Sequence, residues 1–118
     1  MEPTPTRTDG GERTLEVGPG GTWFRPPGGD VVVLTRRKAL ARLLCALADA
    51  RRDRPGQALS RPTLIERGWP GERILPKAAG NRLGVALTTL RKLGLGRLLQ
   101  RTHGGYRLDP AVAVVRAD

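Results

Sequence analysis

Cysteine, histidine and aromatic residues are scarce in this chain of 118 residues, and each scarcity excludes a class of protein. Cys45 is the only cysteine, so no disulfide can form within the chain, which is typical of a reducing compartment. Together with the single histidine, His103, it cannot supply a zinc site of ordinary ligand count. The aromatic residues are Trp23, Phe24, Trp69 and Tyr106. We therefore expect an aliphatic core and no metal.

Long apolar runs and recognisable catalytic arrangements are also missing. No apolar run approaches the length of a membrane span, and the polar N-terminus lacks the apolar segment of a secretory signal. The turn Gly18–Gly21 lacks the lysine and the following helix of a phosphate-binding loop. Asp49 and Asp53 lie one helical turn apart and are expected to pair with arginines. We expect a soluble cytoplasmic protein with no enzymatic activity, no cofactor and no membrane contact.

Acidic residues are outnumbered: 21 Lys and Arg stand against 11 Asp and Glu, for a net charge of +10 and an isoelectric point near 11.5. Such a surplus favours a polyanionic partner, nucleic acid before an anionic membrane surface. Arginine outnumbers lysine 18 to 3, as the codons of a GC-rich genome would produce. That bias explains the choice of arginine over lysine but not the excess of positive charge.

The chain has the length of one domain with short ends. Residues 1–13 combine prolines, glycines and charges without periodicity, so they are expected to be a disordered tail, the alternative being an arm that touches DNA. The domain is expected over residues 14–110. Residues 111–118 are either a C-terminal tail or a short strand through Val112–Val115.

Residues 14–34 have the pattern of a small antiparallel meander. Leu15 and Val17 alternate with polar residues, a glycine-rich turn follows, and Trp23 begins a second strand. The apolar run Val31–Leu34 predicts a third and more buried strand.

A first helix is expected over about residues 35–52, with Thr35 as its N-cap. Its buried stripe is expected to be Leu40, Leu43, Leu44 and Leu47. Cys45 lies in the same apolar run and is expected to be a small core residue and not a reactive thiol. The cations Arg36–Lys38 oppose the helix dipole, so they are either fully solvated or placed near a phosphate.

A second, short helix is expected over about 60–68, with Ser60 as N-cap and Pro62 in its first turn. After a connection over 69–76, a third helix is expected from Pro76 to about Leu93. Its expected buried stripe is Ala79, Leu83, Ala86, Leu87 and Leu90. Its opposite face carries Lys77, Asn81, Val85, Thr88 and Lys92, with Arg82, Thr89 and Arg91 at the shoulders. No acidic residue lies in this helix.

A hairpin is expected after the third helix, with strands over 98–101 and 106–108. Its turn contains Gly104 and Gly105, where positive φ is expected. Arg101 and Arg107 flank the turn and either present charge to a nucleic acid or only solvate the hairpin. His103 is either a solvated turn residue or a phosphate contact. The order helix, helix-turn-helix, hairpin favours an α+β winged helix-turn-helix fold that binds DNA.

Four stretches together resemble the OmpR/PhoB-type winged-helix DNA-binding domain of bacterial transcription regulators. They are Leu34-Thr35, Ser60–Ile65 with Trp69, Leu83–Lys92, and Gly105–Leu108. The chain differs from the usual family pattern at Lys38, Asn81 and His103 and in a longer connection between the second and third helices. The residues before the first helix are too few for the family's receiver domain, so its aspartyl-phosphate switch is not expected.

The resemblance implies a role for each matched position. The third helix would enter the major groove and contact DNA through Lys77, Asn81, Arg82, Val85 and Thr89. Arg61 and Trp69 would hold the phosphate backbone, and the hairpin would reach the adjacent backbone or minor groove through Arg101, Thr102, His103 and Arg107. The family also implies RNA polymerase as a second partner.

The sequence therefore predicts sequence-specific binding of double-stranded DNA by a nucleoid-associated transcription regulator. The alternative is a winged-helix interaction module for an acidic protein. Such a module would expose an apolar patch on the third helix, where only Val85 is apolar. A general nucleoid or RNA-binding protein is a third reading. The pattern leaves open whether the chain acts as a monomer or a dimer.

Overall fold

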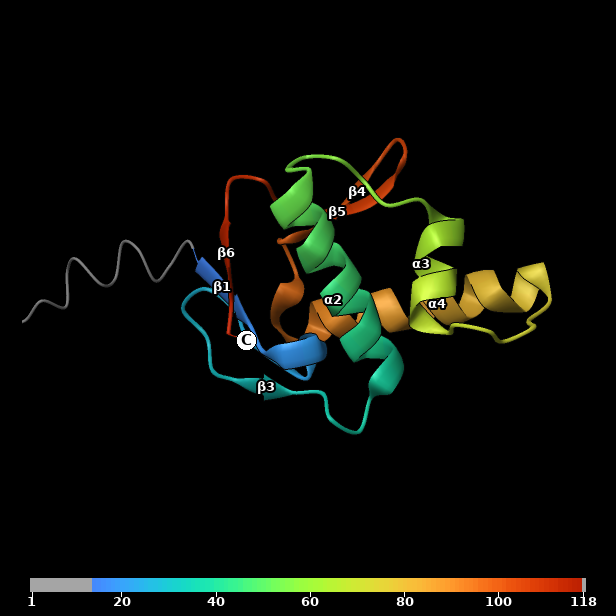
Figure 1. Ribbon diagram of the computed structural model, residues 1–118, viewed down its shortest axis with the longest axis horizontal. Coiled ribbons are helices and arrows are strands. Elements are labelled where there is room, and N and C mark those ends of the chain that lie inside the picture. Colours follow the sequence, from blue (N-terminus) through green and yellow to red (C-terminus); the bar gives the residue numbers. More distant parts are fainter. Residues whose placement is uncertain (1–13, 118) are drawn as a thin grey trace, which may run out of the picture.

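The computed structural model describes residues 14–117, so the tail expected over residues 1–13 lies outside it, as does Asp118. The strands are β1 (Thr14–Val17), β2 (Trp23–Arg25), β3 (Val32–Val33), β4 (Leu99–Thr102), β5 (Gly105–Leu108) and β6 (Ala113–Arg116). The helices are α2 (Lys38–Asp53), α3 (Arg61–Gly68) and α4 (Pro76–Leu90), with short helical turns η1 (Pro19–Gly21) and η2 (Arg91–Leu95). The predicted α+β class with three helices is confirmed (Figure 1).

The larger sheet has the strand order β3-β2-β1-β6. Of the two alternatives left open for residues 111–118, the structure has the short strand, at Ala113–Arg116, and it pairs in parallel with β1, Leu15 lying opposite Val114. Side chains of α2 hold this segment in place. Arg51 donates hydrogen bonds to the carbonyls of Pro110 at 3.0 Å and Val112 at 3.1 Å.

An ion pair between Asp49 of α2 and Arg116 of β6 adds to this attachment. Burial acts to lower the pKa of Arg116, but its hydrogen bonds to Asp49 and Cys45 raise that pKa above the ordinary value. Asp53 pairs with Arg52 at 3.0 Å. The expected pairing of both carboxylates with arginines is thus confirmed.

Strand β3 is not the buried strand that the apolar run predicted. Val31 and Val33 are 53% and 63% exposed, and only Leu34 is fully buried. The reason is the position of β3 at the edge of the sheet, where only β2 pairs with it and alternate side chains face solvent.

Helix α2 begins three residues later than expected. Thr35 is not its N-cap, because a turn closed by a hydrogen bond from Arg37 N to Leu34 O at 2.9 Å comes first. Arg37 occupies the cap position without a side-chain hydrogen bond. The predicted leucine stripe is buried. Cys45 is only partly buried and is not part of the core cluster; it borders Arg116, whose guanidinium donates to its Sγ at 3.5 Å.

Helices α3 and α4 follow the sequence closely. The Ser60 hydroxyl accepts a hydrogen bond from Thr63 N at 3.2 Å, which confirms the expected cap. The buried residues of α4 are the predicted stripe, Ala79, Leu83, Ala86, Leu87 and Leu90. The α-helix ends at Leu90, and the chain continues as the wider π-helical turn η2. Gly94, at φ 145°, lets η2 pass close to the ring of Phe24.

Strands β4 and β5 form the expected hairpin, with His103 and Gly104 as its turn. The backbones of Leu59 and Tyr106 exchange two hydrogen bonds of 2.8 and 2.9 Å, which attach the hairpin to the connection before α3. The sequence predicted positive φ at both Gly104 and Gly105. It occurs at Gly105 (142°) but not at Gly104. The Leu59 carbonyl oxygen lies where a Cβ of Gly105 would stand, whereas a Cβ at Gly104 would meet no atom within 4 Å. The requirement for glycine therefore falls on the first residue of β5 and not on the turn.

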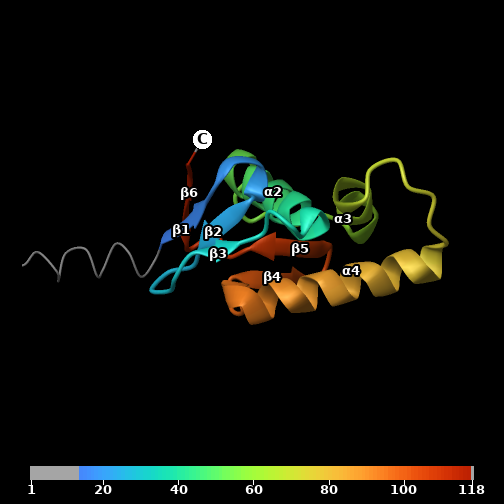
Figure 2. The same cartoon turned by 90° about the horizontal axis from the view of Figure 1, so that it is seen from below.

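The arrangement of the elements places α4 on one edge of the molecule. Figure 2 shows α2, α3 and the hairpin all on the same side of α4, so its other side faces outward. None of the helices described within residues 14–117 has the length and apolar character of a membrane span. The same residues contain no group of three or more His, Cys, Asp or Glu side chains that could hold a metal ion.

Candidate nucleic-acid interface

The outward side of α4 is a polar and cationic surface. Its exposed residues are Lys77, Asn81, Val85 and Thr88, and Lys92 of η2 continues the row. At about 100° per residue these positions span an arc of about 80°. From Arg73 to Leu108, which covers α4, η2 and the hairpin, the chain has no acidic residue and eight basic ones. We call the outward side from Lys77 to Lys92 the α4 face.

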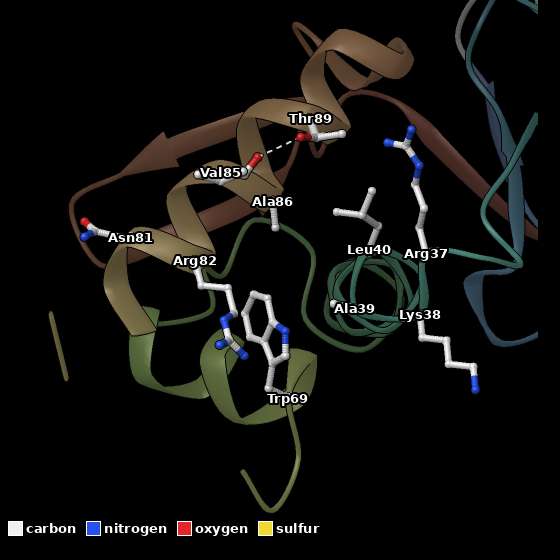
Figure 3. Close-up of a pocket in the computed structure, with 10 residues that line it drawn as sticks. All are labelled: Arg37, Lys38, Ala39, Leu40, Trp69, Asn81, Arg82, Val85, Ala86 and Thr89. Carbon is white, nitrogen blue, oxygen red and sulfur yellow. Dashed lines mark hydrogen bonds between the residues drawn. The ribbon is translucent and has the colours of Figure 1, made fainter. Parts of the chain in front are cut away.

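A hollow of about 610 Å³ separates α4 from the N-terminal end of α2 (Figure 3). Arg37 and Lys38 project from α2 at one side of it, and both are exposed. Asn81, Val85 and Thr89 line its α4 side. The cations that the sequence left either solvated or near a phosphate thus lie beside the α4 face.

Arg82 does not point freely outward. Its guanidinium lies over the ring of Trp69, 5.6 Å from the centroid, and donates a hydrogen bond to Glu72 Oε1 at 3.0 Å. Glu72 lies in the connection between α3 and α4, and the sequence offered no signal for this pairing across ten residues. A base contact from Arg82 would therefore require it to leave a carboxylate. Trp69 is half-buried and supports Arg82.

A second hollow, of about 280 Å³, lies between the start of α3 and the tip of the hairpin. Arg61 and Arg101 line it together with Thr102 and His103. Arg61, Arg101 and His103 are exposed. The structure thus brings together four residues that the sequence placed in two separate elements. The N-terminal end of α3 adds the positive end of a helix dipole.

The Arg61 guanidinium also donates to the Gly80 carbonyl at 3.5 Å, and two other arginines near the hairpin have shorter hydrogen bonds within the protein. Arg107 is half-buried and donates to Gln100 Oε1 at 2.9 Å and to the Gly56 carbonyl at 2.8 Å. Arg91 donates to the Leu99 carbonyl at 3.1 Å and lies 5.9 Å from the centroid of the Tyr106 ring. These contacts fix the hairpin against η2 and the connection before α3. Arg101 is thus the outward cation of the hairpin.

The two hollows lie on opposite sides of α4. In Figure 1, α4 runs across the molecule with the start of α2 below it and the hairpin above it. On the side of α4 that faces the hairpin, the residues next to the α4 face are Gly80 and Gly84, which have no side chains. A Cβ at Gly84 would meet no atom within 4 Å. The α4 face is therefore a ridge between two cationic flanks.

Comparisons with protein-family models, with curated proteins and with solved structures found no significant match to this chain.

Proposed function

We propose that this protein binds double-stranded DNA in a sequence-specific manner, as a winged helix-turn-helix transcription regulator. The observation that carries the proposal is the acid-free α4 face, which protrudes from the molecule between two cationic flanks. An α-helix with its side chains is about 10–12 Å across, and the major groove is about 12 Å wide. A protruding polar helix of this kind can enter the groove.

The cationic residues on the two flanks of α4 supply the phosphate contacts that hold such a helix in the groove. With α4 in the major groove, the phosphates on one side face Arg37 and Lys38, and those on the other side face Arg61 and Arg101. Phosphate contacts of this kind fix the orientation of the protein but carry no sequence information. Side chains of the α4 face are left to contact the base edges.

An interaction module for an acidic protein fits the surface less well. Such a module would need a contiguous apolar patch on α4. Val85, which is 67% exposed, is the one large apolar side chain exposed within α4. Its neighbours on the outward side of α4, Asn81 and Thr88, are polar, which favours a nucleic acid. The apolar residues Ala39, Leu40 and Ala86 line only the hollow towards α2.

Duplex binding is expected to weaken steeply with salt. If about 4–6 phosphates are neutralised, the logarithm of the association constant should fall against the logarithm of salt concentration with a slope of about −4 to −5. Fluorescence anisotropy of a labelled duplex over a salt series measures this slope. A slope near zero, or no binding at low salt, would contradict the proposal and favour the interaction module.

Arg101→Gln and Arg107→Gln are expected to have different effects, although both remove one charge from the hairpin. Arg101 is exposed, so its loss should reduce the salt slope by about 1 unit and leave the fold unchanged. Arg107 donates to Gln100 and Gly56, so its loss should lower the free energy of unfolding by about 1–2 kcal/mol. Anisotropy and urea unfolding separate the two results. Equal effects of both variants on slope and stability would refute this division of roles.

A further inference from the structure

We propose that the α4 face recognises A·T base pairs, with Asn81 bonding to adenine and Val85 contacting the thymine methyl group. The inference names the ligand of the α4 face and rests on the duplex binding proposed above. Three observations support it: the freedom of Asn81, the exposure of Val85, and the absence of an unpaired arginine from the outward arc.

Asn81 lies at the centre of the α4 face and is exposed. Within residues 14–117, no hydrogen bond engages its carboxamide, and Figure 3 shows it pointing away from α2. A carboxamide has an acceptor oxygen and a donor nitrogen side by side. Adenine presents the complementary pair in the major groove, its N6 amino group and N7, whereas guanine presents two acceptors. Asn81 therefore suits adenine.

Val85 follows Asn81 by four residues and lies on the same face. It is 67% exposed and lines the edge of the hollow towards α2, so it is not part of the core. The thymine C5 methyl is the apolar group that B-DNA offers in the major groove. Contact between that methyl and Val85 removes both from water, and cytosine or uracil at the same position lacks the group.

The spacing of the two side chains fits neighbouring base pairs. Four residues of α-helix advance about 6 Å, and successive base pairs are about 3.4 Å apart along each strand. A helix lying along the groove therefore brings Asn81 and Val85 to base pairs one or two steps apart. The expected site contains an adenine and a thymine at that separation.

The partners of the arginines argue against guanine as the principal base. Guanine in the major groove is recognised mainly by arginine or lysine. Arg82, at the shoulder, is paired with Glu72, and Arg91 is bonded to Leu99. Lys77 and Lys92 lie at the two ends of the α4 face, where they would meet phosphates if α4 enters the groove. The centre of the face is thus left to a neutral amide and an apolar side chain.

The test begins with selection of preferred duplexes from a random pool by the full chain. The selected adenine is then replaced by 7-deaza-adenine, which lacks N7, and the thymine by uracil, which lacks the methyl. Each replacement should weaken binding of the unmodified protein about 5- to 10-fold. The 7-deaza penalty should disappear in Asn81→Ala and the uracil penalty in Val85→Ala. Gln57→Ala and Val33→Ala remove an exposed amide and an exposed valine elsewhere and should retain both penalties.

The outcomes separate the inference from the function on which it rests. Salt-dependent binding that is indifferent to both analogues would overturn the inference while duplex binding stands. Selected sites without an A·T pair, or penalties that persist in the two α4 variants, would overturn it as well. No duplex binding at low salt would overturn both proposals. Circular dichroism of each variant checks that the fold is retained, which is expected because both side chains are exposed.

Discussion

Replacing Phe24 by alanine is expected to lower the free energy of unfolding by about 3–5 kcal/mol. The Phe24 ring is fully buried, and it is the largest fully buried side chain in the described part of the chain. It lies where β2, β1 and η2 meet, because Phe24 pairs with Val17 and its ring reaches Gly94. A cavity there would remove the packing between the larger sheet and η2, which follows α4. Urea unfolding followed by circular dichroism measures the loss.

Phe24→Leu is the matched control, since it keeps an apolar side chain of smaller volume. We expect it to cost roughly 1–2 kcal/mol. The same large loss in both variants would show that the ring itself, and not the filled volume, is required. A loss below about 1 kcal/mol in the alanine variant would contradict the packing described for this region.

Gly105→Ala is expected to lower the free energy of unfolding by about 3 kcal/mol or more. Gly105 has φ 142°, where L side chains are strained, and a Cβ there would lie 1.9 Å from the Leu59 carbonyl oxygen. The hairpin must therefore move away from the connection before α3. That movement breaks the two hydrogen bonds between Leu59 and Tyr106. Urea unfolding measures the stability, and amide exchange at Leu59 and Tyr106 reports the release of the hairpin.

Gly104→Ala provides the comparison, because it changes the adjacent glycine of the same hairpin. Gly104 has no positive φ, and a Cβ there would meet no atom within 4 Å. We expect a change within about 0.5 kcal/mol. Equal losses in the two variants would refute the close approach at Gly105 as the cause.

Features that depend on local sequence were predicted well. The spacing of Leu83, Leu87 and Leu90 identified the buried side of α4, because helical periodicity relates neighbours in sequence to neighbours in space. Ser60 marked the start of α3 for a similar reason, since its partner Thr63 lies three residues away. The exposure of the α4 face follows from the same periodicity.

Features that depend on distant segments were missed. The sequence placed Arg82 and Arg107 among free cations, but Glu72 and Gly56 bind them from connections whose course the sequence does not specify. Val33 was expected to be buried because its apolar run is typical of central strands, whereas strand order made β3 an edge. Thr35 is a good helix cap by type, yet the chain makes another turn before α2.

The parallel pairing of β1 with β6 determines how the domain responds to a stretching force. The described chain begins at β1 and ends just after β6, and these strands lie side by side along four residue pairs. A pull on the two ends draws parallel neighbours in opposite directions along their length. All the hydrogen bonds between them then bear the load at once, instead of opening one after another as in a hairpin pulled from its open end. Force applied at Thr14 and Ala117 is therefore expected to load this strand pair in shear before it reaches the helices.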